Sequence, residues 1–137
     1  MSTNHNTFHG AKLVLLIGGR LLVIRRVLTP GIAFPGHLDL PGGGREGQES
    51  ARDCVLRETQ EEVGLSLPAK GLSQEVWVSR AKGYSVFFSA ALPESAARQI
   101  VFGDEGQSWC LMSPLAYLHH PLNVPHFADQ VRGLLQL

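Results

Sequence analysis

Four charged side chains are concentrated in one short stretch, directly behind a glycine-rich loop. Residues 40–65 read LPGGGREGQESARDCVLRETQEEVGL, and they carry Arg57, Glu58, Glu61 and Glu62 on a segment with a helical pattern. Carboxylate oxygens are the ligands that hard divalent cations prefer, and glycines let a backbone approach a bound group closely. The loop lacks the Gly-Lys-Ser/Thr ending of a P-loop, which argues against an NTPase of that class. The stretch therefore indicates either a solvated acidic helix face or a site for a divalent cation and a phosphate chain.

The position of the acids around the predicted helix favours the cation site. At about 100° per residue, Ala51, Cys54 and Val55 share one face of the helix. The glutamates extend that apolar face, whereas a solvated acidic face would lie opposite to it. Glu58 and Glu62 are also like charges four residues apart, which repel each other in an isolated helix. Carboxylates that turn inward need a compensating charge, and a divalent cation would provide it.

The spacing of these residues resembles that of a known family. From Gly43 the sequence reads G-x5-E-x7-R-E-x2-E-E-x-G-L, which resembles the Nudix box, G-x5-E-x7-R-E-U-x-E-E-x-G-U, where U is a bulky aliphatic residue. The one departure is Thr59, at the first aliphatic position. The flanking segments VIRR, LDLPGG, GDEGQSW and HPLNVP resemble corresponding regions of MutT-type members. The resemblance implies an α/β fold, a Nudix-type α/β/α sandwich with a mixed β-sheet flanked by helices.

The same resemblance implies a metal-dependent enzyme. Nudix proteins hydrolyse a nucleoside diphosphate linked to a further group X, with Mg²⁺ or Mn²⁺ as the cofactor. Carried over by position, the metal ligands would be the Gly43 carbonyl and four carboxylates: Glu58, Glu61, Glu62 and Glu105. Glu49 is similar to a second acidic ligand or helper.

The residues that resemble the family's catalytic groups are Arg57, Glu58, Glu61 and Glu105. Arg57 would orient a glutamate through a charge-assisted hydrogen bond, or form an ordinary surface ion pair. Glu105 and Glu58 compete for the role of general base. The alternative for Glu105 is a loop acid in solvent.

The resemblance to MutT-type members favours nucleoside triphosphates as substrates, including oxidised ones, with release of a monophosphate and pyrophosphate. Asn123 could bind a purine edge, because an amide both donates and accepts hydrogen bonds, or it could stabilise a turn. Arg26 could contact phosphate or end a strand. Leu40 is a predicted substrate-binding residue, at a position where the resembled enzymes carry an aromatic residue. ADP-ribose, a dinucleoside polyphosphate or a nucleotide sugar are alternative substrates, and a non-catalytic nucleotide sensor is an alternative function.

The elements that must position these residues follow from the sequence pattern. Apolar runs bounded by turn residues predict strands at 11–17, 21–25, 74–80, 84–92 and 108–112, the first two forming a hairpin. The box predicts a helix from about Ser50 to Val63 that ends at Gly64. Further helices are predicted at 113–118 and 125–137. Residues 1–10 are polar and aperiodic and predict a flexible tail, which leaves a single domain over residues 11–137.

Bulk properties limit the partners. The 137 residues contain twelve basic and twelve acidic side chains, so no net charge favours DNA, RNA or an anionic membrane. Cys54 and Cys110 fit no zinc motif, and we expect buried free thiols in a reducing compartment. The apolar run at 13–24 is interrupted by Arg20 and is too short to span a membrane, which predicts a cytoplasmic protein. Monomer and homodimer both stay open.

Overall fold

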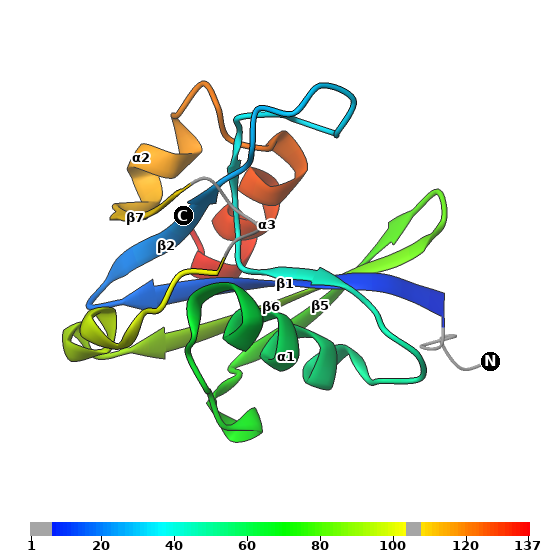
Figure 1. Cartoon of the computed structure of the whole chain (residues 1–137), viewed down its shortest axis with the longest axis horizontal. Helices are drawn as coiled ribbons and strands as arrows, with labels where there is room; N and C mark the ends of the chain where they lie inside the picture. The colour runs from blue at the N-terminus through cyan, green and yellow to red at the C-terminus, as the bar shows by residue number, and fades with distance from the viewer. Residues whose placement is uncertain (1–6, 104–107) are drawn as a thin grey trace.

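A mixed β-sheet lies between helices in the computed structural model, which describes residues 7–103 and 108–137 (Figure 1). The strands are β1 (Phe8–Ile17), β2 (Arg20–Arg25), β3 (Leu38–Asp39), β4 (Gly42–Gly44), β5 (Gln74–Arg80), β6 (Gly83–Leu92) and β7 (Ser108–Met112). The α-helices are α1 (Ala51–Val63), α2 (Pro114–Leu118) and α3 (Pro125–Leu135). Two short 3₁₀ helices, η2 (Ala69–Gly71) and η3 (Glu94–Gln99), complete the described elements.

The sheet is built around β1 and β6, which run parallel over their whole length. The main strand order is β3-β2-β1-β6-β5, while β4 pairs with β1 and β7 pairs with β2. The other pairings between the described strands are antiparallel. Leu13, Val14 and Leu15 in β1 are all completely buried. A continuous apolar run of this kind is typical of a strand that is covered on both faces.

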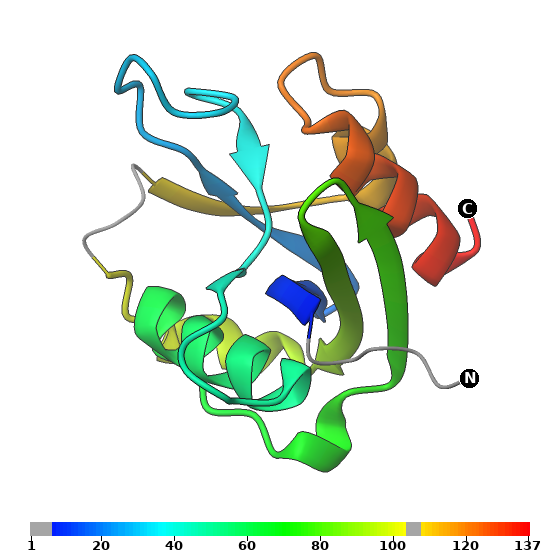
Figure 2. The same cartoon turned by 90° about the vertical axis from the view of Figure 1, so that its right-hand side faces the viewer.

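The two faces of the sheet are covered by different helices, as Figure 2 shows. On one face, Cys54 and Val55 of α1 pack in the same cluster as Leu13 and Leu15. On the other face, Val14 lies in a cluster with residues of α2 and α3. Successive residues of a strand point to opposite sides, so β1 contributes to both clusters. This three-layer arrangement confirms the predicted α/β/α sandwich.

Helix α1 begins and ends where the sequence predicts. The Ser50 side chain accepts a hydrogen bond of 3.1 Å from the Asp53 amide, which caps the first turn. Gly64 takes the left-handed conformation, with φ of 70°, and its amide donates to the Gln60 carbonyl. A side chain at that φ would be strained, so the glycine fixes the end of the helix.

Two expectations were wrong in detail. Strand β1 begins at Phe8, so residues 8–10 belong to the sheet and not to a flexible tail. Their partners are distant in sequence: Gly10 pairs with Gly44 of β4 and with Ser85 of β6. Cys54 is buried as a free thiol, but Cys110 is exposed, because β7 turns alternate residues outward. None of the helices in the described ranges is long and apolar enough to cross a membrane.

Candidate metal and phosphate site

The glycine loop and helix α1 meet because β4 pairs with β1. Gly42 lies opposite Lys12, and Gly43 lies opposite Ala11. The strands approach so closely that a Cβ on Gly42, whose φ is 132°, would collide with the Ala11 carbonyl. The chain after β4 leads directly into α1, and α1 packs against β1. The loop carbonyls and the inward acids of the helix are therefore held side by side.

Glu58 occupies the space that a side chain on Gly43 would take. A Cβ built at Gly43 would collide with the Glu58 carboxylate, whose side chain is 14% exposed. The Gly43 carbonyl faces the helix and accepts a 3.6 Å hydrogen bond from the Cys54 thiol. One carboxylate and one backbone carbonyl thus lie together, and both are hard oxygen donors.

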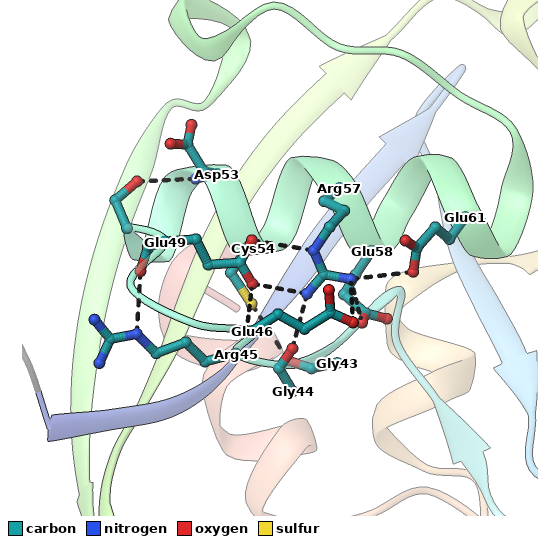
Figure 3. A network of polar contacts seen from close by, with 11 residues as sticks. Gly43, Gly44, Arg45, Glu46, Glu49, Asp53, Cys54, Arg57, Glu58 and Glu61 are labelled. Atoms are coloured by element: carbon teal, nitrogen blue, oxygen red, sulfur yellow. Dashed lines mark hydrogen bonds and ion pairs between the residues drawn. The ribbon is translucent and has the colours of Figure 1, made fainter.

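Arg57 is the centre of the polar network in Figure 3. Its guanidinium donates to both carboxylate oxygens of Glu49, at 2.7 and 3.0 Å, and to the Gly44 carbonyl at 2.9 Å. It also donates to Glu58 at 2.9 Å and to Glu61 at 3.1 Å. The hydrogen bonds from Arg57 lower the pKa of Glu49 to about 2. Arg57 therefore connects the loop to the acids of the helix. This network favours the orienting role of Arg57 over an ordinary surface ion pair.

Glu62 contacts the glycine loop at Gly42. Its carboxylate accepts a 2.8 Å hydrogen bond from the Gly42 amide. Burial raises the pKa of Glu62 to about 7, and the negative charges of Asp39 and Glu58 contribute in the same direction. A buried carboxylate with acidic neighbours gains from an added cation.

Acids and bases line one cavity of about 300 Å³, called here the first cavity. Its polar lining comprises Lys12, Arg26, Asp39, Glu58, Glu62 and the glycines of β4. Carboxylates beside a basic pair suit a cation that in turn binds an anion. The donor set of hard oxygens fits Mg²⁺ or Mn²⁺, with the Gly43 carbonyl, Glu58 and Glu62 as the groups that could hold it.

Asp39 is a site residue that the sequence analysis missed. Only 6% of it is exposed, and it forms ion pairs with Lys12 at 3.0 Å and Arg26 at 2.9 Å. It also accepts a 2.6 Å hydrogen bond from the Leu40 amide. Two features of the sequence could have indicated this residue: an acid within the apolar segment LDLP, and Lys12 within the apolar run AKLVLL. Buried charges are paired in folded proteins, so each of these residues required a partner.

A second cavity of about 430 Å³ shares four lining residues with the first: Lys12, Arg26, Gly43 and Gly44. Arg80, His126 and Phe127 also line it, and no Asp or Glu belongs to the part of its lining that the structure describes. Burial lowers the pKa of His126, and the positive charge of Arg80 contributes in the same direction. The second cavity is therefore cationic and partly aromatic.

The structure gathers several of the predicted site residues and leaves others apart. Arg26, Gly43, Glu58 and Glu62 line the first cavity, and Arg57 lies behind Glu58. Glu61 is 55% exposed and turns toward Arg57. Glu105 lies outside the described residues. Among residues 7–103 and 108–137, no three His, Cys, Asp or Glu side chains form a ready-made metal cluster.

Leu40 does not lie where a substrate could stack on it. Its side chain is completely buried in the cluster beside Tyr117, Val124 and Phe127. The prediction of substrate contact through that side chain was therefore wrong, because the residue faces the core beneath α2 and α3. The backbone of Leu40 contacts residues that line the first cavity: its carbonyl accepts a 3.3 Å hydrogen bond from Lys12, and its amide donates to Asp39.

Asn123 supports the end of helix α2. Its side-chain amide donates to the carbonyls of Tyr117 and Leu118, at 3.0 and 3.1 Å. Neither cavity includes Asn123 in its lining. The structure therefore favours the turn alternative over the base-reading one.

The chain is similar to known proteins over most of its length. The sequence profile described as the NUDIX domain matches residues 7–131. A prenyl-diphosphate phosphatase from Methanosarcina mazei is 30% identical over 94 residues, which cover 67% of this chain and 55% of that protein. The chain thus spans about half the length of this relative.

Solved structures show the same fold. The chain is similar to a MutT protein from Methanosarcina mazei Go1, with a TM-score of 0.73, 19% identity, and coverage of 98% of this chain and 97% of that one. A mutT/nudix family protein from Listeria innocua gives a TM-score of 0.76 at 22% identity, over 99% and 94% of the two chains. An Ap4A hydrolase from C. elegans gives 0.72 at 17% identity, over 93% and 96%.

Proposed function

The chain belongs to the NUDIX domain family, and from this membership we propose that it hydrolyses the phosphoanhydride of a nucleoside diphosphate linked to a group X, with Mg²⁺ or Mn²⁺. The observation that carries the proposal is the composition of the first cavity. Glu58, Glu62 and the glycines of β4 line it together with Lys12 and Arg26. Such a lining can accept a divalent cation and a phosphate chain in the same space.

The proposed cation site consists of the Gly43 carbonyl, Glu58 and Glu62, with Glu61 as a further ligand once it leaves Arg57. Glu105 is a proposed additional ligand or base. When bound, a divalent cation neutralises phosphate charge and lowers the pKa of a coordinated water.

The chain's own residues would orient the substrate and accept a proton. Glu58 is the proposed base among the described residues, since Arg57 holds one carboxylate oxygen while the other lies beside Gly43. Arg57 would keep that carboxylate in place through this charge-assisted hydrogen bond. Arg26 would bind a phosphate oxygen at the side of the cavity.

For the substrate we propose nucleoside triphosphates, cleaved to a monophosphate and pyrophosphate. The second cavity supports this choice, because Lys12, Arg26 and Arg80 line it and suit a further negatively charged group. Recognition of an oxidised base, which the sequence resemblance suggested, would need residues other than Asn123 and Leu40.

A second candidate substrate class is prenyl diphosphates. The 30% identity to a prenyl-diphosphate phosphatase favours it, and Phe87 and Phe127 give the second cavity an apolar part. The charged lining of that cavity is less suited to a hydrocarbon chain, which gains from apolar contact.

The test is a substrate screen with product identification. Nucleoside triphosphates, ADP-ribose, dinucleoside polyphosphates, nucleotide sugars and prenyl diphosphates would be incubated with Mg²⁺ or Mn²⁺. We expect Glu58→Gln and Glu62→Gln to lower kcat by at least about 100-fold, the usual contribution of positioned acid-base groups. Glu94→Gln is the control, because Glu94 is 81% exposed and pairs only weakly with Arg20 at 3.9 Å.

Absence of turnover on every compound with either metal would contradict the proposed activity. Nucleotide binding without turnover would then support the sensor alternative. Equal activity of the parent and both glutamine variants would contradict the site assignment.

A further inference from the structure

A buried acid sits where the two cavities meet, although it is not part of helix α1. Asp39 ends β3 and is 6% exposed. Its partners Lys12 and Arg26 line both cavities, while Asp39 lines only the first. The negative charge of an acid in a site for phosphate repels the ligand. Such a residue therefore needs basic partners that balance its charge, and a role that explains its presence.

The hydrogen bonds of Asp39 use both of its oxygens within the protein. One oxygen accepts a hydrogen bond from the Leu40 amide at 2.6 Å and forms an ion pair with the Lys12 ammonium at 3.0 Å. The other accepts from the Arg26 guanidinium at 2.9 Å. Asp39 therefore differs from Glu58 and Glu62, because basic side chains hold both of its oxygens.

The two basic partners differ in what they offer a ligand. Besides its ion pair with Asp39, the Lys12 ammonium donates hydrogen bonds to the carbonyls of Leu40 at 3.3 Å and Gly42 at 3.2 Å. Lys12 thus ties β1 to the glycine loop, because its ion pair with Asp39 and its hydrogen bonds to the two carbonyls engage the ammonium within the protein.

Arg26 keeps donors for a ligand. A guanidinium has five N–H donors, and one of its terminal nitrogens is bonded to Asp39. The buried Nε has no hydrogen-bond partner within the described ranges. The side chain is 29% exposed at the border between the cavities.

We propose that Asp39 is a positioning residue, which holds the Arg26 guanidinium at the border of the two cavities so that Arg26 binds the phosphate chain of the substrate. This inference rests on the proposed function, because it assigns the recognition of the same diphosphate. The carboxylate fixes one edge of the guanidinium, and the terminal N–H groups that it leaves would bind the ligand. Lys12 balances the charge, so that the three side chains together carry one net positive charge.

The experiment measures two affinities on the full chain. One is the affinity for Mn²⁺ alone, and the other is the affinity for a methylene-bridged, non-hydrolysable nucleoside triphosphate with Mn²⁺ present. We expect Asp39→Asn to weaken binding of the analogue about 10-fold, the loss typical of one charge-assisted hydrogen bond. The affinity for Mn²⁺ alone should stay within about twofold, because Asp39 is not a ligand in this assignment. In turnover, KM should rise while kcat changes little.

A double-mutant cycle tests whether Asp39 acts through Arg26. Arg26→Ala should weaken binding of the analogue at least as much as Asp39→Asn does. Adding Asp39→Asn to Arg26→Ala should then produce no further loss of affinity for the analogue. Arg20→Ala is the matched control, because Arg20 begins β2, which ends just before Arg26, and it is 50% exposed and lines neither cavity.

Three results would overturn the inference: additive losses in the cycle, a loss of Mn²⁺ affinity of about 10-fold in Asp39→Asn, or analogue affinity equal to that of the parent. If Asp39→Asn does not fold, Asp39→Glu replaces it. That variant keeps the charge but displaces the carboxylate, and an unchanged analogue affinity would count against the inference. A parent chain that binds no analogue would instead contradict the proposed function itself.

Discussion

Arg57 holds Glu49 by two parallel hydrogen bonds, with Nη2 2.7 Å from Oε1 and Nε 3.0 Å from Oε2 (Figure 3). Glu49 belongs to the loop before α1, and Arg57 lies in the middle of the helix. The same guanidinium reaches Glu58 and the Gly44 carbonyl. The pair therefore fixes the loop that carries the glycines against the helix that carries the acids.

Arg57→Lys should destabilise the fold, because an ammonium cannot reproduce the two-point contact of a guanidinium. We expect the free energy of unfolding to fall by about 1–3 kcal/mol, measured by urea denaturation. Arg52→Lys is the control, since Arg52 is 47% exposed and its ion pair with Glu75 is 3.4 Å long. A loss no larger than in the control would show that the Arg57 network adds little stability.

The low pKa of Glu49 predicts a loss of stability in acid. The pKa of Glu49 falls from 4.5 to about 2 on folding, because Arg57 donates hydrogen bonds to the carboxylate. The unfolded chain therefore takes up this proton first, and the stabilisation present above pH 4.5 is lost as the pH falls toward 2. The contribution at neutral pH is at most about 3 kcal/mol.

The measurement compares the parent with Glu49→Gln. The difference in free energy of unfolding should be largest near neutral pH and should shrink steadily below pH 4.5. Glu94→Gln, at a site that is 81% exposed, should differ little from the parent over the same range. A difference between parent and Glu49→Gln that does not change with pH would contradict the assigned role.

Gly43→Ala should disturb the site and leave the fold intact. The new methyl group would meet the Glu58 carboxylate, the end of a flexible side chain that can move away. We expect a loss of activity of about 100-fold, as small displacements of catalytic groups commonly cause, and weaker Mn²⁺ binding. Circular dichroism and the Tm would report on the fold.

Gly44→Ala is the matched control for that variant. The nearest atom to its new Cβ would be the His9 carbonyl oxygen, at 3.9 Å, so the residue fits without displacing Glu58. Equal activity of the two alanine variants would mean that the contact between Gly43 and Glu58 is unimportant.

Asn123→Ala should lower stability without changing substrate affinity. The side-chain amide donates to two carbonyls at the end of α2, so its removal should cost about 1–2 kcal/mol in unfolding experiments. KM should stay within about twofold, since Asn123 lines neither cavity. His119→Ala, at an exposed position after the same helix, is the control. A raised KM with unchanged stability would restore the base-reading alternative.

The sequence by itself determined the local parts of the site. Ser50 and Gly64 fix the two ends of α1 through contacts within a few residues, and the spacing of Glu58 and Glu62 places both on one side of the helix. Such features depend on backbone geometry that is the same in every α-helix. The family resemblance, and with it the α/β/α layers, also followed from this one stretch.

Only the tertiary structure decided the partners of residues that lie far apart in the chain. Asp39 meets Lys12 because β4 pairs with β1 and β3 pairs with β2, and no local pattern records those pairings. Leu40 faces the core for the same reason, one residue further along the chain. Adjacent residues in an extended segment point to opposite faces of a sheet, so a shift of one position exchanges a core side chain for one that lines a cavity. The long-range strand pairing determines which residue takes each of the two positions.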